Sequence, residues 1–185
     1  MGSFVTRKYI CDYGYELDGV IIMGTGHQPT PMVLVGKALA DITRFIKGDR
    51  YRSRLISKIM FGAYNKRIKN VRTSNDWLTR DETVVDEYNA GKLTTFLFTV
   101  NGYRGLMNMI LYVRKPRNIA KIPKNLPMLM VSGLDDPVGE YGKGVYRAYN
   151  TYHGHIDDID LRLFEDCRHE LCNELNKEEI YEEIY

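Results

Sequence analysis

Residues 128–137 read MLMVSGLDDP, a compact apolar run that ends at a glycine and two aspartates. Such a short, continuous apolar run is typical of a strand that is buried on both faces of a parallel sheet. We therefore expect a strand at Met128–Ser132, with a loop at its carboxyl end. Functional groups of open parallel sheets gather at the carboxyl ends of the strands, so Asp135 and Asp136 are candidates for a functional role.

Two further segments have the pattern of strands. Residues 17–23 (LDGVIIM) form a second apolar run, which is closed by Gly24-Thr25-Gly26. Apolar and polar side chains largely alternate over residues 159–164 (IDLRLF), which is typical of a half-exposed strand. Three strands separated by helical segments predict an α/β fold with a parallel sheet and right-handed crossovers.

The rest of the chain has helical spacing. Helices are predicted over residues 3–13, 31–47, 51–66, 81–90, 94–113, 139–152 and 170–184. Pro116 and the stretch 121–127 (KIPKNLP) should break helical structure. In the last helix the side chains expected to point inward are Leu171, Leu175, Ile180 and Ile184. This order predicts a core built from residues 1–30 and 116–185, with a helical insertion at residues 31–115.

Composition excludes several classes of protein. The 185 residues have a formal net charge of +2, so no global field favours nucleic acid as a partner. Residues 47–72 are nevertheless rich in Lys and Arg and residues 157–185 in acids, which indicates two solvated faces or a basic rim for anionic head groups. The chain has three cysteines without CxxC spacing, and no apolar run approaches the roughly 18 residues of a membrane span. We expect a cytoplasmic protein without a signal peptide or stable membrane insertion.

Asp136 and His169 are the candidate catalytic pair. A histidine acts as a general base when a carboxylate holds its other ring nitrogen and fixes the tautomer. Each of the two residues follows a predicted strand, and parallel neighbours bring their carboxyl ends together. The spacing alone leaves two other roles open for His169, namely a helix cap and a pair with Asp166.

Two longer segments resemble a known family. Residues 126–144 (LPMLMVSGLDDPVGEYGKG) resemble the acid loop, and residues 163–176 (LFEDCRHELCNELN) the histidine loop, of lysophospholipase and monoacylglycerol lipase-like α/β-hydrolases, which are also labelled serine aminopeptidase-like. The resemblance implies that Asp136 is the triad acid and His169 the base, in the order Ser, Asp, His. It also implies that residues 31–115 form a helical lid, in which residues 76–81 (DWLTRD) resemble a recurrent segment and Trp77 serves as an anchor.

The first three residues of the chain resemble the end of the family's nucleophile motif. In these relatives the nucleophile motif G-x-S-x-G commonly reads G-H-S-M-G-S, and Met1-Gly2-Ser3 resembles its last three residues. The resemblance therefore implies that the backbone N–H of Met1 serves the oxyanion hole and that the chain begins just after the nucleophilic serine. The chain has no G-x-S-x-G motif, so none of its candidate serines can be the nucleophile of such a motif: Ser3, Ser53, Ser57, Ser74 and Ser132.

The resemblance implies a serine hydrolase that acts on carboxylic esters such as lysophospholipids or monoacylglycerols, without a cofactor or metal. Because it lacks the serine, the chain is expected to be inactive alone. Two alternatives remain open: a non-catalytic lipid- or partner-binding module, and a half-enzyme that a separate N-terminal chain complements. The aromatic and methionine side chains of residues 31–115 could line an acyl pocket, but most are expected to form the lid's own core.

Two weaker signals are set aside. Gly24-Thr25-Gly26 lacks the third glycine of a dinucleotide-binding loop, because position 29 is Pro29. His153-Gly154-His155 with Asp157 and Asp158 has the chemistry of metal ligands, yet its place between a helix and a strand indicates a solvated turn.

Overall fold

The computed structural model describes residues 1–184, which hold a three-stranded parallel sheet in the order β1-β2-β3. The strands are β1 (Val20–Met23), β2 (Met128–Gly133) and β3 (Ile159–Phe164). In register, Val20 lies beside Met128 and Met130 beside Leu161. The parallel sheet, and the strands predicted for all three apolar segments, are confirmed.

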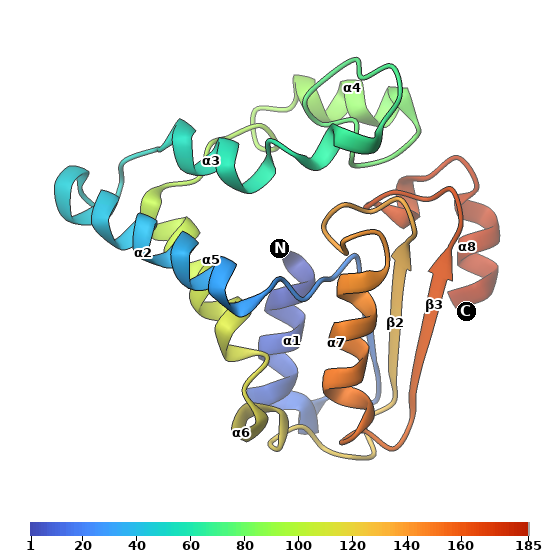
Figure 1. Cartoon of the computed structure of the whole chain (residues 1–185). Coiled ribbons are helices and arrows are strands. Elements are labelled where there is room, and N and C mark those ends of the chain that lie inside the picture. Colours follow the sequence, from blue (N-terminus) through green and yellow to red (C-terminus); the bar gives the residue numbers. More distant parts are fainter. Residues whose placement is uncertain (185) are drawn as a thin grey trace.

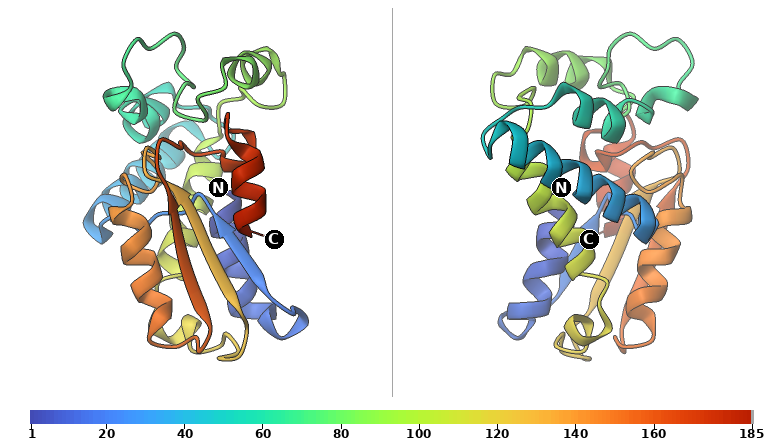
Figure 2. Two further views of the ribbon diagram at one scale, coloured as in Figure 1. Left: turned by 90° about the vertical axis from the view of Figure 1, so that its right-hand side faces the viewer. Right: turned by 60° about the vertical axis from the view of Figure 1, so that its left-hand side comes forward.

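Helices cover both faces of the sheet. Figure 1 shows α1 (Gly2–Tyr13) and α7 (Lys143–His153) on one face, and α8 (Lys177–Ile184) on the other. In the left view of Figure 2 the three strands lie side by side, with α8 in front of the sheet and α1 behind it. Between β1 and β2 lie α2 (Thr30–Lys47), α3 (Arg54–Phe61), α4 (Glu82–Ala90), α5 (Val100–Tyr112) and α6 (Pro116–Ile119). Of these, α3 and α4 lie beyond the carboxyl ends of the strands (Figure 1), where they face the loops that carry the candidate site.

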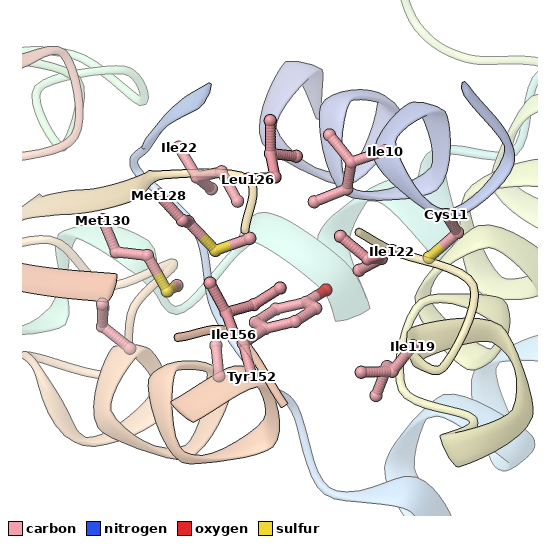
Figure 3. Close-up of a cluster of buried hydrophobic side chains, with 12 residues drawn as sticks. Ile10, Cys11, Ile22, Ile119, Ile122, Leu126, Met128, Met130, Tyr152 and Ile156 are labelled. Atoms are coloured by element: carbon pink, nitrogen blue, oxygen red, sulfur yellow. The ribbon is translucent and has the colours of Figure 1, made fainter. Parts of the chain in front are cut away.

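The main core lies between the sheet and the helices α1 and α7. Its centre contains Ile22 of β1, Met130 of β2 and Tyr152 of α7, which are all fully buried. Figure 3 shows the Tyr152 ring among aliphatic side chains from α1, the strands and the segment after α6. A smaller cluster on the other face packs Ile180 of α8 against Val131 of β2. Burial on both faces explains why the β2 segment is apolar throughout.

The helical segment between β1 and β2 has its own apolar contacts. Val33 of α2 packs with Leu106 and Ile110 of α5, and Ile56 of α3 packs with Tyr103. Most of its aromatic and methionine side chains are buried or half-buried, but a group of large apolar side chains on α2 and α3 is exposed: Met32, Val35, Ile42, Phe45, Ile46, Leu55 and Ile59. Phe45 is 93% exposed. A broad apolar surface on this segment is therefore left uncovered by the described residues.

Two helices in this segment begin later than predicted. The helix expected at 51–66 is α3 followed by a 3-10 turn, Tyr64–Arg67, because the Ser53 hydroxyl accepts from the Ile56 N–H at 3.2 Å and caps the helix there. The helix expected at 94–113 begins at Val100, because Thr99 caps it through the Gly102 N–H at 3.1 Å. Local capping thus sets both boundaries.

The C-terminal helices also differ from the prediction. The helix expected at 139–152 starts at Lys143, because Glu140 and Tyr141 have left-handed backbones with φ of 51° and 57°. The helix expected at 170–184 is a 3-10 turn, Leu171–Asn173, followed by α8. Leu175 lies between them and is 65% exposed, so its predicted inward position is wrong. A short helix, α6, occupies the start of the predicted break, with Pro116 in its first turn.

Candidate active site

The loops after β2 and β3 are held together by backbone hydrogen bonds. The Leu134 N–H donates to the Phe164 carbonyl, and the Asp135 N–H donates to the Cys167 carbonyl, each at 2.9 Å. Gly133 permits this approach, because a Cβ at this position would collide with the carbonyl oxygen of Cys167. The two loops therefore form one surface at the carboxyl edge of the sheet.

This surface brings Asp136 and His169 together. His169 Nδ1 lies 3.0 Å from Asp136 Oδ2. The Asp136 carboxylate is fully buried, while the His169 side chain remains 17% exposed. The other carboxylate oxygen, Oδ1, accepts the Val138 N–H at 2.8 Å, and the Ser132 hydroxyl lies 3.5 Å from Oδ2. A buried carboxylate held in this way favours the tautomer with the proton on Nδ1, which leaves Nε2 free to accept a proton.

The other two roles considered for His169 do not fit this geometry. Among the described residues, the ring of His169 hydrogen-bonds Asp136, whereas Asp166 makes no ion pair with it. Asp166 lies in the turn after β3, with φ of 55°. His169 also precedes a 3-10 turn whose N-cap is Glu170, so it does not cap a helix.

An open pocket of about 290 Å³ adjoins His169. It is lined by Met1, Gly2, Ser3, Met23, Gly24, His169, Glu170, Cys172 and Asn173. Helix α1 begins at Gly2 without a side-chain cap, so its free N–H groups and positive dipole end lie at this pocket. A helix terminus of this kind suits a developing oxyanion.

Met1 lies in this pocket. The role of the Met1 N–H in an oxyanion hole stays a prediction.

The serines occupy several environments. Ser3 lines the pocket, and its hydroxyl donates to the Gly24 carbonyl at 3.2 Å. Ser132 is buried beneath Asp136, and Ser53 caps α3. Neither buried serine presents its hydroxyl at the tip of a sharp strand-to-helix turn, which is where a nucleophile of this fold class sits.

Two neighbours of His169 were not assigned to the site from the sequence. The ring centroid of Trp77 lies 5.2 Å from that of His169, with the planes tilted by 47°. Gly24, with φ of 59°, lies so close that an added Cβ would be 2.9 Å from His169 Cε1. Trp77 is the single tryptophan of the chain, but its distance in sequence from His169 carried no signal of contact.

The ligand chemistry noted at residues 153–158 has another use at His155. His155 Nε2 lies 2.7 Å from the Ile122 carbonyl oxygen, so this ring nitrogen is hydrogen-bonded to the backbone. Within residues 1–184, no group of three or more His, Cys, Asp or Glu side chains is placed to hold a metal ion. In the same part of the chain, no helix combines the length and apolar character that a membrane crossing requires.

Comparisons with known proteins agree with this geometry. Residues 1–176 match the family model described as serine aminopeptidase, S33. A carboxyl esterase from Bacillus coagulans superposes with a TM-score of 0.85 at 22% identity, over 98% of this chain and 58% of that chain. Monoglyceride lipase from Saccharomyces cerevisiae gives a TM-score of 0.71 at 16% identity, over 98% and 59%. Monoacylglycerol lipase from Paleococcus ferrophilus gives 0.67 at 16% identity, over 98% and 62%.

These structures establish the fold, and this chain spans about three fifths of their length. No curated protein matches the chain significantly. The family model covers nearly the whole chain and confirms the resemblance seen in the acid and histidine loops. The chain therefore belongs to the serine aminopeptidase S33 family, with the parallel sheet and flanking helices of an α/β-hydrolase.

Proposed function

We propose that Asp136 and His169 are the acid and base of a Ser-His-Asp triad that hydrolyses carboxylic esters. The observation that carries this proposal is the 3.0 Å contact between His169 Nδ1 and the fully buried carboxylate of Asp136. This contact orients the imidazole and stabilises the imidazolium that forms during the reaction. The open pocket beside His169 gives the substrate access to the base.

The reaction proceeds in two steps. His169 Nε2 takes the proton of a serine hydroxyl as its oxygen attacks the ester carbonyl, and then gives that proton to the leaving alcohol. Water attacks the resulting acyl-enzyme in the same manner, and His169 returns the proton to the serine. The free N–H groups at the start of α1 stabilise the oxyanion of each tetrahedral intermediate.

We propose that the nucleophilic serine belongs to a segment outside these 185 residues, because the chain holds no G-x-S-x-G motif. β1 pairs with β2 along one edge, and its other edge has no strand partner within residues 1–184. A strand added at this edge would end beside the pocket that contains Met1 and His169. The segment could belong to the same polypeptide or to a separate N-terminal chain.

The proposed substrates are lysophospholipids, monoacylglycerols or other small esters. Two structural neighbours are described as monoglyceride lipases and one as a carboxyl esterase. Residues 31–115 would act as the lid, and its exposed apolar side chains on α2 and α3 suit contact with an acyl chain.

A chimera tests this proposal. The part of the Bacillus coagulans carboxyl esterase that this chain does not cover is joined to the N-terminus of residues 1–185, and hydrolysis of p-nitrophenyl butyrate is measured. We expect activity in the chimera and none in the isolated chain. Asp136→Asn should lower kcat by about 10⁴-fold, as expected when the histidine tautomer is no longer held.

Asp135→Asn is the matched control, because Asp135 is the exposed neighbour in the same loop and should retain activity. A fluorophosphonate probe should label the chimera and lose this labelling in His169→Gln. An active chimera whose rate is unchanged by both Asp136→Asn and His169→Gln would contradict the assigned triad.

A second candidate function is lipid binding without catalysis, which the uncovered apolar surface of α2 and α3 favours. In that case the isolated chain would bind lysolipid micelles, and His169→Ala would leave the binding unchanged. Loss of binding when Phe45 and Leu55 are replaced by serine would locate the lipid on this surface.

A further inference from the structure

We propose that Trp77 is a positioning residue, which holds the His169 ring with Nδ1 turned towards Asp136. This inference rests on the proposed role of His169 as the base. Its basis is a cage of three neighbours around the imidazole: Asp136 at Nδ1, Trp77 beside the ring, and Gly24, whose position leaves no room for a Cβ next to Cε1.

One hydrogen bond is not enough to fix the ring. The torsion that turns an imidazole about its Cβ–Cγ bond has broad minima, so a ring held at Nδ1 alone can still swing. The Trp77 ring, 5.2 Å away between centroids, limits movement on one side. Gly24 limits it at Cε1, where no room remains for a side-chain carbon. The imidazole is therefore confined by these three neighbours and is open on the side that faces the pocket.

The segment Asp76–Arg80, here called the arm, is bonded directly to the histidine loop. The Arg168 guanidinium donates to the carbonyls of Asp76 and Thr79 at 2.7 and 2.9 Å. The Glu170 N–H donates to the Leu78 carbonyl at 2.7 Å. These bonds lie on both sides of His169 in sequence, so the arm and the histidine loop must move together.

The far end of the arm is anchored by charge. Arg80 Nε lies 2.9 Å from Glu174 Oε2, and the Glu174 side chain is fully buried. The Thr79 hydroxyl donates to the Asn173 carbonyl at 2.8 Å. An ion pair with a fully buried carboxylate sets a definite geometry, because leaving that carboxylate without its partner is costly.

Trp77 is also supported from its other side. The backbone N–H of Trp77 donates to the side-chain carbonyl of Asn65 at 2.9 Å. The Tyr64 ring meets the Trp77 ring edge-on, with centroids 4.9 Å apart. Trp77 thus lies between His169 and the 3-10 turn that follows α3. A shift of that turn would therefore also move the ring that packs beside the imidazole.

The test is NMR of the full chain with ¹⁵N-labelled histidine, in which His169→Gln assigns the His169 signals. We expect a low-field Nδ1–H resonance that is protected from exchange with water, and cross-relaxation between the rings of Trp77 and His169. Trp77→Leu should lose the Nδ1–H resonance through faster exchange, whereas Trp77→Phe should retain it because a ring still covers the imidazole.

Tyr15→Leu is the control, since Tyr15 is an exposed aromatic residue that should not affect His169. A folded Trp77→Leu variant with an unchanged, protected Nδ1–H resonance would overturn the proposal. The cross-relaxation experiment needs no substitution, and its failure in the wild-type chain would also overturn the proposal if Trp77→Leu does not fold. These readouts do not depend on hydrolysis, so an inactive chimera with an intact cage would count against the proposed function alone.

Discussion

The turn after β1 is surrounded by positively charged side chains. Three arginines donate to three successive carbonyls: Arg7 to Gly26 at 2.8 Å, Arg147 to His27 at 3.2 Å, and Arg114 to Gln28 at 2.9 Å. Arg7 is almost completely buried and makes no ion pair within the described residues, although it also donates to the Tyr152 hydroxyl. Hydrogen bonds from three guanidinium groups therefore hold this turn in place, and they surround it with positive charge.

This charge makes His27 a pH-sensitive residue. Burial lowers the pKa of His27 to about 4, and the charges of Arg114, Arg7 and Arg147 add to the effect. The unfolded chain binds a proton at this position below about pH 6.5, which the folded chain resists until about pH 4. Stability should therefore fall as pH decreases through this window, by about 2 kcal/mol after allowance for partial exposure.

Urea unfolding of the wild type and of His27→Gln at pH 7 and pH 4.5 measures this contribution. The loss between the two pH values should be smaller in His27→Gln, and unchanged in His153→Gln, whose side chain is exposed. Equal losses in the wild type and His27→Gln would show that His27 does not carry the effect.

At the scale of elements, α1 and β1 together present an uncovered surface. Met1, Val5, Tyr9 and Tyr13 recur at four-residue spacing along α1 and are 41–54% exposed. We call this set the α1 stripe. The edge of β1 beside it has no strand partner among residues 1–184. An open edge with neighbouring apolar side chains is prone to pair with another chain.

We therefore expect the isolated chain to self-associate. Sedimentation velocity over a range of concentrations should show a species larger than the monomer. Val5→Glu should reduce this association, because it places a charge in the α1 stripe, and a carboxylate near a helix N-terminus is tolerated. Tyr146→Glu, on an exposed position of α7, is the control and should have little effect. A chain that stays monomeric throughout would refute this expectation.

At the scale of the whole molecule, the arm links the middle of the chain to its C-terminal part. Arg80 and Glu174 are 94 positions apart, and their ion pair joins the segment before α4 to the turn before α8. Glu174 also accepts the N–H of Arg168 at 2.7 Å, so one buried carboxylate holds the arm and the histidine loop. The helical segment is thus not free to move as one body away from the sheet.

A double-mutant cycle tests this connection. Arg80→Met should lower the free energy of unfolding by about 3 kcal/mol, because it leaves the buried Glu174 charge unpaired. Adding Glu174→Gln removes that charge and should recover about 1 kcal/mol. Arg44→Met, which removes an exposed partner of Asp49, should change stability by less than about 0.5 kcal/mol. Additive losses at Arg80 and Glu174 in urea unfolding would show that the two side chains are not coupled.

The sequence by itself determined the sheet and pointed to the candidate catalytic pair. The apolar runs at 17–23 and 128–132 could become stable only by burial, so they marked strands without knowledge of their neighbours. Asp136 and His169 were predicted as a pair because each follows a strand, because parallel strands align their carboxyl ends, and because the loops around them resemble those of a known family. These features depend on the spacing of apolar residues and on the order of strands and loops along the chain. Both can be read directly from the sequence.

Only the tertiary structure decided which distant groups complete the site and where several helices begin and end. The turn around Glu174 replaces the first part of the helix expected at 170–184, because its carboxylate binds Arg80 from another part of the chain. Trp77 and Gly24 meet His169 across long stretches of sequence, and no local pattern records such contacts. Packing between segments is a property of their positions in space, so it appears only once the chain has folded.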